Sequence, residues 1–234
     1  MIIAVVNQKG GAGKTTLAVN LAVHLFDQGL NVAMVDNDPQ QSAARWIARA
    51  EPGIACESVL EARDLVGTLE TLDEQHDVVV CDGAPRLNEQ THVLMYFAGR
   101  ILIPTRPTTL DLQATIETKQ AIDKVQAARV ADDRGDIDVR LLLNFVRTVG
   151  NLHKTVREAL RAMDYPLAAH AIGMRDAIAK AVTLQTTVGR LAAESPADKG
   201  AQAAARDFQQ LFDEILPDAL HAHRAHDHAL RQAA

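Results

Sequence analysis

Short apolar segments alternate with longer amphipathic segments along most of this chain of 234 residues. The short segments are nearly continuous in their apolar character, which is typical of strands that are buried on both faces. The longer segments repeat apolar residues at three- and four-residue intervals, as helices packed on a sheet do. This alternation predicts an α/β fold with a mostly parallel central sheet flanked by helices on both faces.

The same pattern predicts the bounds of the individual elements. The predicted strands are residues 2–6, 31–36, 54–58, 77–82, 100–104, 139–144 and 166–170. The predicted helices are residues 14–28, 39–50, 61–74, 88–98, 109–130, 152–163, 174–184 and 197–216. Gly29 fits the end of the first helix, where a residue with positive φ is needed, and residues 132–136 read as an exposed loop. We expect a single domain over residues 1–217 and a flexible, His-rich tail over residues 218–234.

Composition agrees with one well-buried domain in the cytoplasm. The chain is 47% hydrophobic and contains only two cysteines, Cys56 and Cys81, so no disulfide framework is expected. No apolar run approaches the roughly 20 residues that span a bilayer. The chain begins with a strand rather than a basic segment and a cleavage site, and we therefore expect no secretion signal.

Net charge and aromatic content restrict the kinds of nucleic-acid binding that are possible. The formal net charge is −6, which excludes a globally basic binder but leaves room for a local basic patch. One Trp, two Tyr and five Phe are too few for a platform that stacks single-stranded bases. Any DNA binding is therefore expected to use phosphates, without sequence choice.

A glycine-rich segment between the first strand and the first helix predicts a phosphate-binding loop. The segment is K-G-G-A-G-K-T-T, made of Lys9, Gly10, Gly11, Ala12, Gly13, Lys14, Thr15 and Thr16. Its glycines let backbone N–H groups close around an anion, and the positive end of the following helix points into the same space. We expect Lys14 to contact the β- and γ-phosphates and the Thr15 hydroxyl to contact Mg²⁺, so that the chain binds a nucleoside triphosphate.

Aspartates stand at the ends of the second and fourth predicted strands, and the carboxyl ends of parallel strands lie beside the phosphate loop. Asp36 and Asp38 belong to the segment D-N-D-P-Q, and Asp82 follows the apolar residues 78–81. One aspartate delivered by an apolar strand is how a Walker-B carboxylate reaches Mg²⁺. The alternative for the first pair is structural, with Asp36 ending a strand and Asp38 capping a helix.

The loop departs from the common G-x-x-x-x-G-K-[ST] pattern, because Gln8 stands where the first glycine is expected and Lys9 follows it. With this second lysine, the chain resembles the ParA/MinD family of deviant Walker-A ATPases, whose signature is K-G-G-x-G-K-[ST]. The resemblance continues through D-N-D-P-Q, D-G-A-P at 82–85 and I-L-I-P-T-R-P at 101–107, and it covers residues 1 to about 216.

The resemblance implies a role for each matching residue. Lys9 reaches across an ATP-sandwiched homodimer to the partner's phosphates, Asp38 positions or activates the attacking water, and Asp36 and Asp82 support Mg²⁺. Asn144 lies in the adenine pocket of relatives, although a turn at the strand end is an equal reading of this residue. Residues 83–88 would form a switch that senses the γ-phosphate.

Other branches of the family fit less well. Iron-protein reductases need cysteines that bridge a cluster, and Cys56 and Cys81 lie in the wrong places. MinD-like proteins end in a basic helix that lies on membranes, whereas the last helix here carries an apolar stripe at 208, 211, 212 and 215 flanked by acids. The simpler reading of this stripe is a face that packs on the domain. The chain begins at the phosphate loop, so it resembles the short ParA form without an N-terminal helix-turn-helix region.

The ParA resemblance implies non-specific binding of double-stranded DNA by the ATP-bound dimer. Helix 152–163 places cations on one face, although a solvated helix face is the alternative. The candidate contacts are His153, Lys154, Arg157 and Arg161 on this helix, and Arg175, Lys180 and Arg190 further along the chain.

The sequence therefore predicts a slow ATPase that associates with the nucleoid and segregates or positions a cargo. A ParB-like or cargo-adaptor protein is expected to stimulate hydrolysis, and no membrane attachment is expected. A MinD-like membrane-associated ATPase and a metabolic P-loop enzyme that phosphorylates a small acid are the alternatives.

Overall fold

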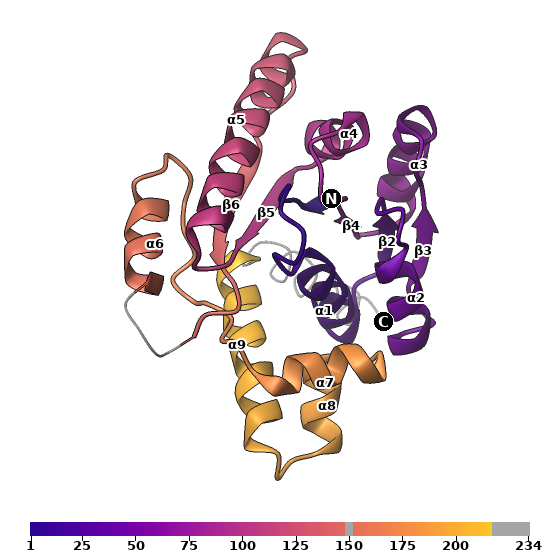
Figure 1. The fold of residues 1–234 in the computed structure, drawn as a ribbon. Helices are drawn as coiled ribbons and strands as arrows, with labels where there is room; N and C mark the ends of the chain where they lie inside the picture. The colour runs from indigo at the N-terminus through magenta and orange to yellow at the C-terminus, as the bar shows by residue number, and fades with distance from the viewer. Residues whose placement is uncertain (148–151, 217–234) are drawn as a thin grey trace, which may run out of the picture.

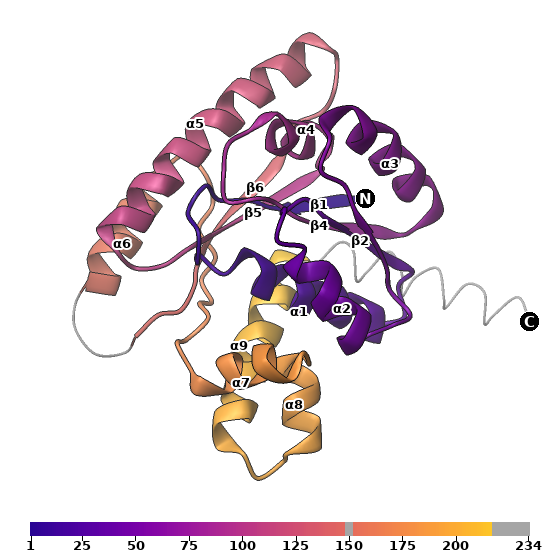
Figure 2. The same cartoon turned by 45° about the vertical axis from the view of Figure 1, so that its right-hand side comes forward.

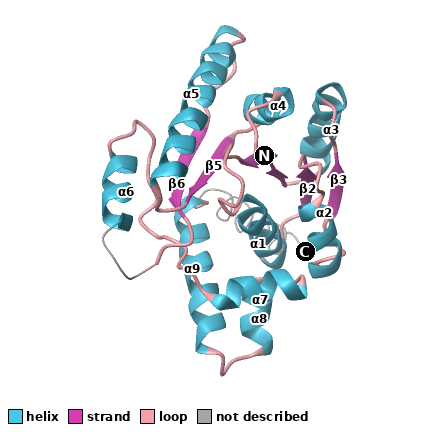
Figure 3. Ribbon diagram, viewed as in Figure 1, coloured by secondary structure: helices cyan, strands magenta, loops and turns pink. Residues whose placement is uncertain are grey.

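The computed structural model describes residues 1–147 and 152–216. Within them, strands and helices alternate along the chain, as Figures 1 and 3 show. The strands are β1 (Ile2–Val5), β2 (Val32–Asp36), β3 (Ala55–Ser58), β4 (Val78–Asp82), β5 (Arg100–Thr105) and β6 (Asp138–Leu143). The helices are α1 (Lys14–Asp27), α2 (Ser42–Ala50), α3 (Ala62–Gln75), α4 (Glu89–Phe97), α5 (Thr109–Ala131), α6 (Leu152–Arg161), α7 (Asp176–Leu184), α8 (Val188–Glu194) and α9 (Lys199–Ile215).

All six strands are parallel and form one sheet in the order β3-β2-β4-β1-β5-β6. β1 therefore lies near the middle, between β4 and β5. In the register of the sheet, Val5 is paired with Asp82, and Asp82 is paired with Asp36. The carboxyl ends of β1, β2 and β4 thus meet at the same edge, and the phosphate loop leaves the sheet there.

Helices cover both faces of the sheet, as the expected fold class requires (Figure 2). Residues of α1, α2 and α7–α9 form one buried cluster with alternate residues of the strands, such as Val78 and Val80. Residues of α3–α6 form the second cluster with the intervening residues, such as Val79 and Cys81. Because both faces are buried, the inner strands β1, β2, β4 and β5 lack the polar alternation of a half-exposed sheet, whereas the edge strands β3 and β6 carry polar residues that are exposed or half-buried.

Most elements expected from the sequence are confirmed, with ends shifted by up to three residues. Gly29 adopts φ 91° beyond the end of α1, and residues 132–136 are exposed as expected. The helix expected from residue 39 begins at Ser42, and α8 was not anticipated. The sequence pattern that marks α8 is short: Thr187 is the N-cap, and Val188 and Leu191 are the buried residues that follow it. The expected tail lies outside the described residues.

The prediction of a strand at residues 166–170 is wrong. Only an isolated bridge, between Leu141 and Leu167, joins this segment to β6. The backbone N–H groups of Ala169 and His170 donate to the carboxylate of Glu214 on α9, at 2.6 and 2.9 Å, instead of continuing a ladder. A tertiary contact 45 residues away thus competes successfully with the sheet, which local pattern cannot show.

No helix among the described residues combines the length and apolarity needed to cross a membrane. The apolar stripe of α9 instead packs in the core, where Phe208, Leu211, Phe212 and Ile215 are at most 3% exposed. Packing of α9 on the domain, the simpler reading of this stripe, is therefore confirmed.

A buried arginine fastens the end of α9 to the sheet. Arg100, at the start of β5, is 7% exposed and donates from Nη1 to the carbonyl of Ile215 at 2.6 Å. Its Nε and Nη2 atoms contact Asp138 at 2.8 and 2.7 Å. The last carbonyls of a helix lack hydrogen-bond donors within the helix. The Arg100 guanidinium supplies a donor to one of these carbonyls in α9.

We expect Arg100→Met to lower the free energy of unfolding by about 2–3 kcal/mol, because a helix-end carbonyl and a carboxylate lose a charged donor. Urea unfolding followed by circular dichroism measures the change. The control is Arg63→Met, since the Arg63 side chain is 84% exposed, and it should change stability by less than about 0.5 kcal/mol. Equal effects of the two substitutions would contradict the role of Arg100.

Candidate functional site

The phosphate loop adopts backbone conformations that depend on glycine. Gly11 and Gly13 have φ angles of 76° and 93°. A Cβ atom on Gly13 would overlap Nδ2 of Asn144 and lie 2.8 Å from the Phe145 ring. The loop is thus closed tightly against the end of β6, and Gly13 precedes the first residue of α1. Gly10 and Gly11 are exposed at the tip of the loop, where an anion can reach their N–H groups.

Lys14 is the first residue of α1 and is buried, with 6% exposure. Its ammonium donates to the carbonyl oxygen of Lys9 at 3.2 Å, so the side chain folds back over the loop. Burial lowers the pKa of Lys14, while the charges of Asp82 and Asp38 act in the opposite direction. A group in this position favours a nearby anion, because the anion would offset the cost of burying its charge.

Thr15 and Asp82 meet where a cation beside the phosphates is expected. The Thr15 hydroxyl donates to Oδ2 of Asp82 at 2.6 Å. Asp82 is fully buried, and its Oδ1 atom has no hydrogen-bond partner among the described residues. Burial raises the pKa of Asp82 to about 7, although the hydrogen bond from Thr15 acts to lower the pKa. An unpartnered buried carboxylate oxygen next to a hydroxyl fits Mg²⁺, which prefers oxygen ligands.

Asp36 holds the segment that carries Asp38. One oxygen of the buried Asp36 carboxylate accepts from the N–H of Asp38 at 3.0 Å, and the other accepts from the N–H of Ala44 at 2.9 Å. Burial raises the pKa of Asp36, and these N–H groups oppose the rise. Asp36 is thus a support for the Asp38 segment and for the first turn of α2.

Asp38 itself is partly exposed, and its Oδ1 atom accepts from the N–H of Gln40 at 2.9 Å. It does not cap α2, which begins at Ser42 with Gln41 as its N-cap. The purely structural reading of Asp38 as a helix cap is therefore wrong, because the chain makes a turn over residues 38–41 before the helix starts.

Asn7, which sequence reasoning did not single out, organises the start of the loop. It is 1% exposed, and its Oδ1 atom accepts from the N–H of Lys9 at 2.9 Å. Its Nδ2 atom donates to the carbonyl of Pro104 and to the Thr115 hydroxyl. Asn7 therefore connects the phosphate loop with β5 and α5. The only sequence signal is an amide directly after an apolar strand.

Asn144 supports the loop from the other side. It is 2% exposed, its Nδ2 atom donates to the carbonyl of Ala12 at 2.8 Å, and its Oδ1 atom accepts from the N–H of Phe145. Beyond it lies a cavity of about 420 Å³. Its lining, which is mainly apolar, includes Thr16, Phe145, Met174, Arg175, Ile178 and Val182.

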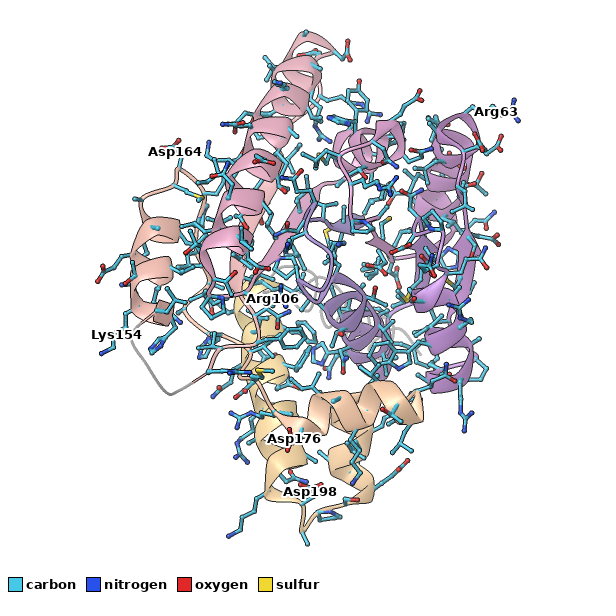
Figure 4. The ribbon with its side chains drawn as sticks, viewed as in Figure 1. Arg63, Arg106, Lys154, Asp164, Asp176 and Asp198 are labelled. Carbon is cyan, nitrogen blue, oxygen red and sulfur yellow. The ribbon has the colours of Figure 1, made fainter. Side chains whose placement is uncertain are left out.

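The candidate DNA contacts divide into paired and unpaired cations. Arg175 contacts Asp207 at 2.8 Å, Lys180 lies 3.7 Å from Asp198, and Arg190 contacts Asp27 and Glu51. The other candidates lie on α6, which packs on the opposite face of the sheet. Figure 4 shows Lys154 pointing outward from this helix.

On α6, Lys154 and Arg161 have no salt bridge within the described residues, and Arg157 donates only to the carbonyl of Ala169, at 3.3 Å. The structure therefore does not bring all the candidate cations together on one surface.

Comparison with known proteins gives a consistent result. A family model described as the CobQ/CobB/MinD/ParA nucleotide binding domain matches residues 3–188. Over 219 residues the chain is 29% identical to a maintenance of carboxysome distribution protein A from Halothiobacillus neapolitanus, covering 92% of this chain and 96% of that protein. It is 30% identical over 155 residues to the chromosome-partitioning ATPase Soj from Thermus thermophilus, covering 53% of this chain and 62% of Soj.

Solved structures share the fold. The ATP complex of a McdA variant from Cyanothece matches with a TM-score of 0.71 at 14% identity, covering 92% of this chain and 95% of that one. MinD from Pyrococcus horikoshii, complexed with Mg-ADP, matches with a TM-score of 0.67 at 19% identity, covering 92% and 95%. The expected α/β class with a parallel sheet between two helical layers is confirmed.

The raised pKa of Asp82 generates a prediction about stability. Between its ordinary value of 3.8 and about 7, the folded protein binds more protons than the unfolded chain, so stability falls as pH rises through this range. Asp82→Asn removes the ionisation. We expect it to raise the free energy of unfolding at pH 8 by about 1 kcal/mol or more, and to have little effect at pH 4.

Urea unfolding without nucleotide or Mg²⁺ at the two pH values measures this difference. The control is Asp64→Asn, because the Asp64 side chain is 60% exposed and should show no such pH dependence. If Asp82→Asn changed stability equally at both pH values, burial of the Asp82 charge would not be the cause.

Proposed function

The chain belongs to the CobQ/CobB/MinD/ParA nucleotide-binding family, and we propose that it is a ParA-type ATPase that positions or segregates a large cargo. The observation that carries this proposal is a glycine loop in which the Lys14 ammonium contacts the Lys9 carbonyl, beside an Asp82 oxygen that has no hydrogen-bond partner within residues 1–147 and 152–216. Proteins similar in sequence to this chain are named for carboxysome distribution and chromosome partitioning, which supports a positioning role. We propose ATP and Mg²⁺ as its ligands.

In this proposal Lys14 leaves the Lys9 carbonyl and contacts the β- and γ-phosphates. Thr15 and Asp82 hold Mg²⁺, which neutralises phosphate charge when it is bound. Asp36 keeps the Asp38 segment in place through its two backbone hydrogen bonds, and Asp38 orients the attacking water. Because Asp36 already accepts two N–H groups, its contribution to the metal is indirect.

The cavity next to Thr16 is the proposed adenine site. It adjoins the first turn of α1, and Phe145 offers a ring on which a base can stack. Both polar ends of the Asn144 side chain are engaged by the protein. We therefore assign Asn144 the role of holding Ala12 and Phe145 in position, rather than direct contact with the base.

Lys9 is proposed to connect two copies of the chain. Its backbone is held by Asn7, while its half-buried side chain belongs to the start of the loop. A lysine about 4 Å from a phosphate charge of the second copy gains roughly 4 kcal/mol at an effective dielectric constant near 20, before desolvation. Without a triphosphate the basic loops of two copies would repel each other, so dimerisation follows ATP.

We propose that the ATP-bound dimer binds DNA without sequence preference and thereby associates with the nucleoid. Lys154, Arg157 and Arg161 on α6 are favoured, because the carboxylates beside Arg175, Lys180 and Arg190 offset their charges. A dimer doubles the patch on α6, which compensates for the net charge of −6. A ParB-like or cargo-adaptor protein would then accelerate hydrolysis and release the dimer.

The proposal is tested by binding to a random-sequence DNA duplex with ATP, ADP or no nucleotide across a salt series. We expect binding only with ATP, with a steep loss of affinity as salt rises. The variant with Lys154, Arg157 and Arg161 replaced by Ala should bind DNA more weakly. The slope of its log binding constant against log salt concentration should be less steep, by about one unit for each lost phosphate contact.

The matched control replaces Arg63 and Lys124, which are exposed on α3 and α5, and should bind DNA as the unmodified protein does. ATP-dependent dimers that bind no DNA at any salt concentration would contradict the DNA-based function. Unchanged DNA binding by the α6 variant would contradict only the assignment of the DNA contacts to α6, and not the DNA-based function itself.

Lys9→Ala should abolish ATP-driven dimerisation while sparing most of the nucleotide affinity, because Lys14 and the loop backbone remain. Asp38→Ala is the complementary variant and should form ATP-bound dimers that no longer hydrolyse. Light scattering measures the dimer, and phosphate release measures turnover. Loss of all nucleotide binding in Lys9→Ala would make Lys9 an ordinary loop residue, and normal turnover in Asp38→Ala would exclude its role.

A further inference from the structure

Arg106 lies against the tip of the phosphate loop, although it is remote from the loop in sequence. It follows β5, and its Nη1 atom is 3.7 Å from the point where a Cβ atom on Gly11 would stand. Figure 4 shows Arg106 between α5 and α1, in the region where the loop leaves the sheet. This guanidinium is therefore within reach of an anion held by the N–H groups of the loop.

A buried carboxylate holds the Arg106 side chain in one orientation. Nε and Nη2 donate to the two oxygens of Asp111 at 3.0 and 3.2 Å. Asp111 is 1% exposed, and Thr108 donates its hydroxyl to the same carboxylate and caps α5. Two of the three guanidinium nitrogens thus bind the carboxylate in a two-pronged arrangement. Because the guanidinium is planar and rigid, these two bonds also fix the position of the third nitrogen, Nη1.

The Arg106 side chain borders space that an anion can enter. Among the described residues, Nη1 of Arg106 has no hydrogen-bond partner. The side chain is 35% exposed and lines a cavity of about 350 Å³ together with Phe145 and Met174. These two residues also line the proposed adenine cavity, so the two spaces adjoin each other. An already oriented donor loses little side-chain freedom when it binds an oxygen.

The strand order puts Arg106 on a distinct side of the bound nucleotide. β4 and β2 deliver Asp82 and Asp36 on one side of β1, whereas β5 delivers Arg106 on the other. A triphosphate in the loop would therefore have the acidic, Mg²⁺-binding side at one flank and a fixed arginine at the other. This arrangement supplies a third cation to a loop that otherwise contains Lys9 and Lys14.

We propose that Arg106 is a further phosphate-binding residue of the nucleotide site and that Asp111 positions it. This inference rests on the proposed function, since it requires that the loop binds ATP. The bond is an N–H of Nη1 donated to a phosphate oxygen of the nucleotide in the same subunit. Asp111 contributes by fixing the fork and does not touch the nucleotide.

Titration with fluorescent analogues of ATP and ADP tests the proposal. Arg106→Ala should weaken both affinities on the order of tenfold or more, the usual effect of losing a charged hydrogen bond. The control is Arg140→Ala, because Arg140 is 36% exposed and pairs with Asp138 on β6 in a similar way. Its affinities should equal those of the unmodified protein.

Two further variants separate binding from folding. Arg106→Ala leaves the buried Asp111 unpaired, whereas the double variant Arg106→Met/Asp111→Asn removes both charges and should unfold near the normal temperature. Its nucleotide affinity should be as low as that of Arg106→Ala. Asp111→Asn alone should weaken binding less, and combining it with Arg106→Ala should cause no additional loss.

Unchanged ATP and ADP affinities in the folded double variant would overturn the proposal. The same conclusion follows if Arg140→Ala weakens binding as much as Arg106→Ala does. Failure of the proposed function has different signatures. If the loop does not bind ATP, the unmodified protein binds neither nucleotide. If the loop binds ATP but the chain is not a DNA-binding positioning ATPase, the loss of affinity in Arg106→Ala persists while DNA binding is absent.

Discussion

The parallel pairing of β4 with both β1 and β2 is the constraint on which the site depends. It places Val5, Asp36 and Asp82 at the same level of the sheet, so that the phosphate loop leaves β1 directly beside two carboxylates. Parallel strands need crossover connections, and these connections are the helices that bury both faces. A slip of one residue between β1 and β4 would move Asp82 away from Thr15 and turn it to the other face of the sheet.

The site combines charges whose burial is costly with a carboxylate that is only partly satisfied by hydrogen bonds. Lys14 and Asp82 are both buried, and their pKa values are shifted in the directions that burial dictates. One oxygen of Asp82 has no partner among the described residues. Bound phosphate oxygens and a divalent ion would satisfy these groups together, so ligand binding and the order of the loop are expected to be coupled.

α5 supports the phosphate loop at two separate points. Near its N-terminus, Asp111 orients Arg106 toward Gly11. One turn later, Thr115 contacts Asn7, and Thr118 accepts from the N–H of Gln8. A shift of this helix along the sheet would therefore move the start of the loop and the arginine beside its tip together. Because α5 is 23 residues long, its far end lies well away from the nucleotide site (Figure 1).

Local sequence was sufficient to place the six sheet strands, the phosphate loop and the aspartates at the ends of β2 and β4, because strand patterns and glycine loops are properties of neighbouring residues. It also identified the apolar face of α9 as a packing face. Only the tertiary structure decided that residues 166–170 leave the sheet for Glu214, that Asn7 and Asn144 hold the loop, and that Arg175 and Arg190 are paired with carboxylates. Each of these contacts joins residues more than 30 positions apart or depends on how the loop closes, and no local pattern records which distant partner a polar side chain will meet.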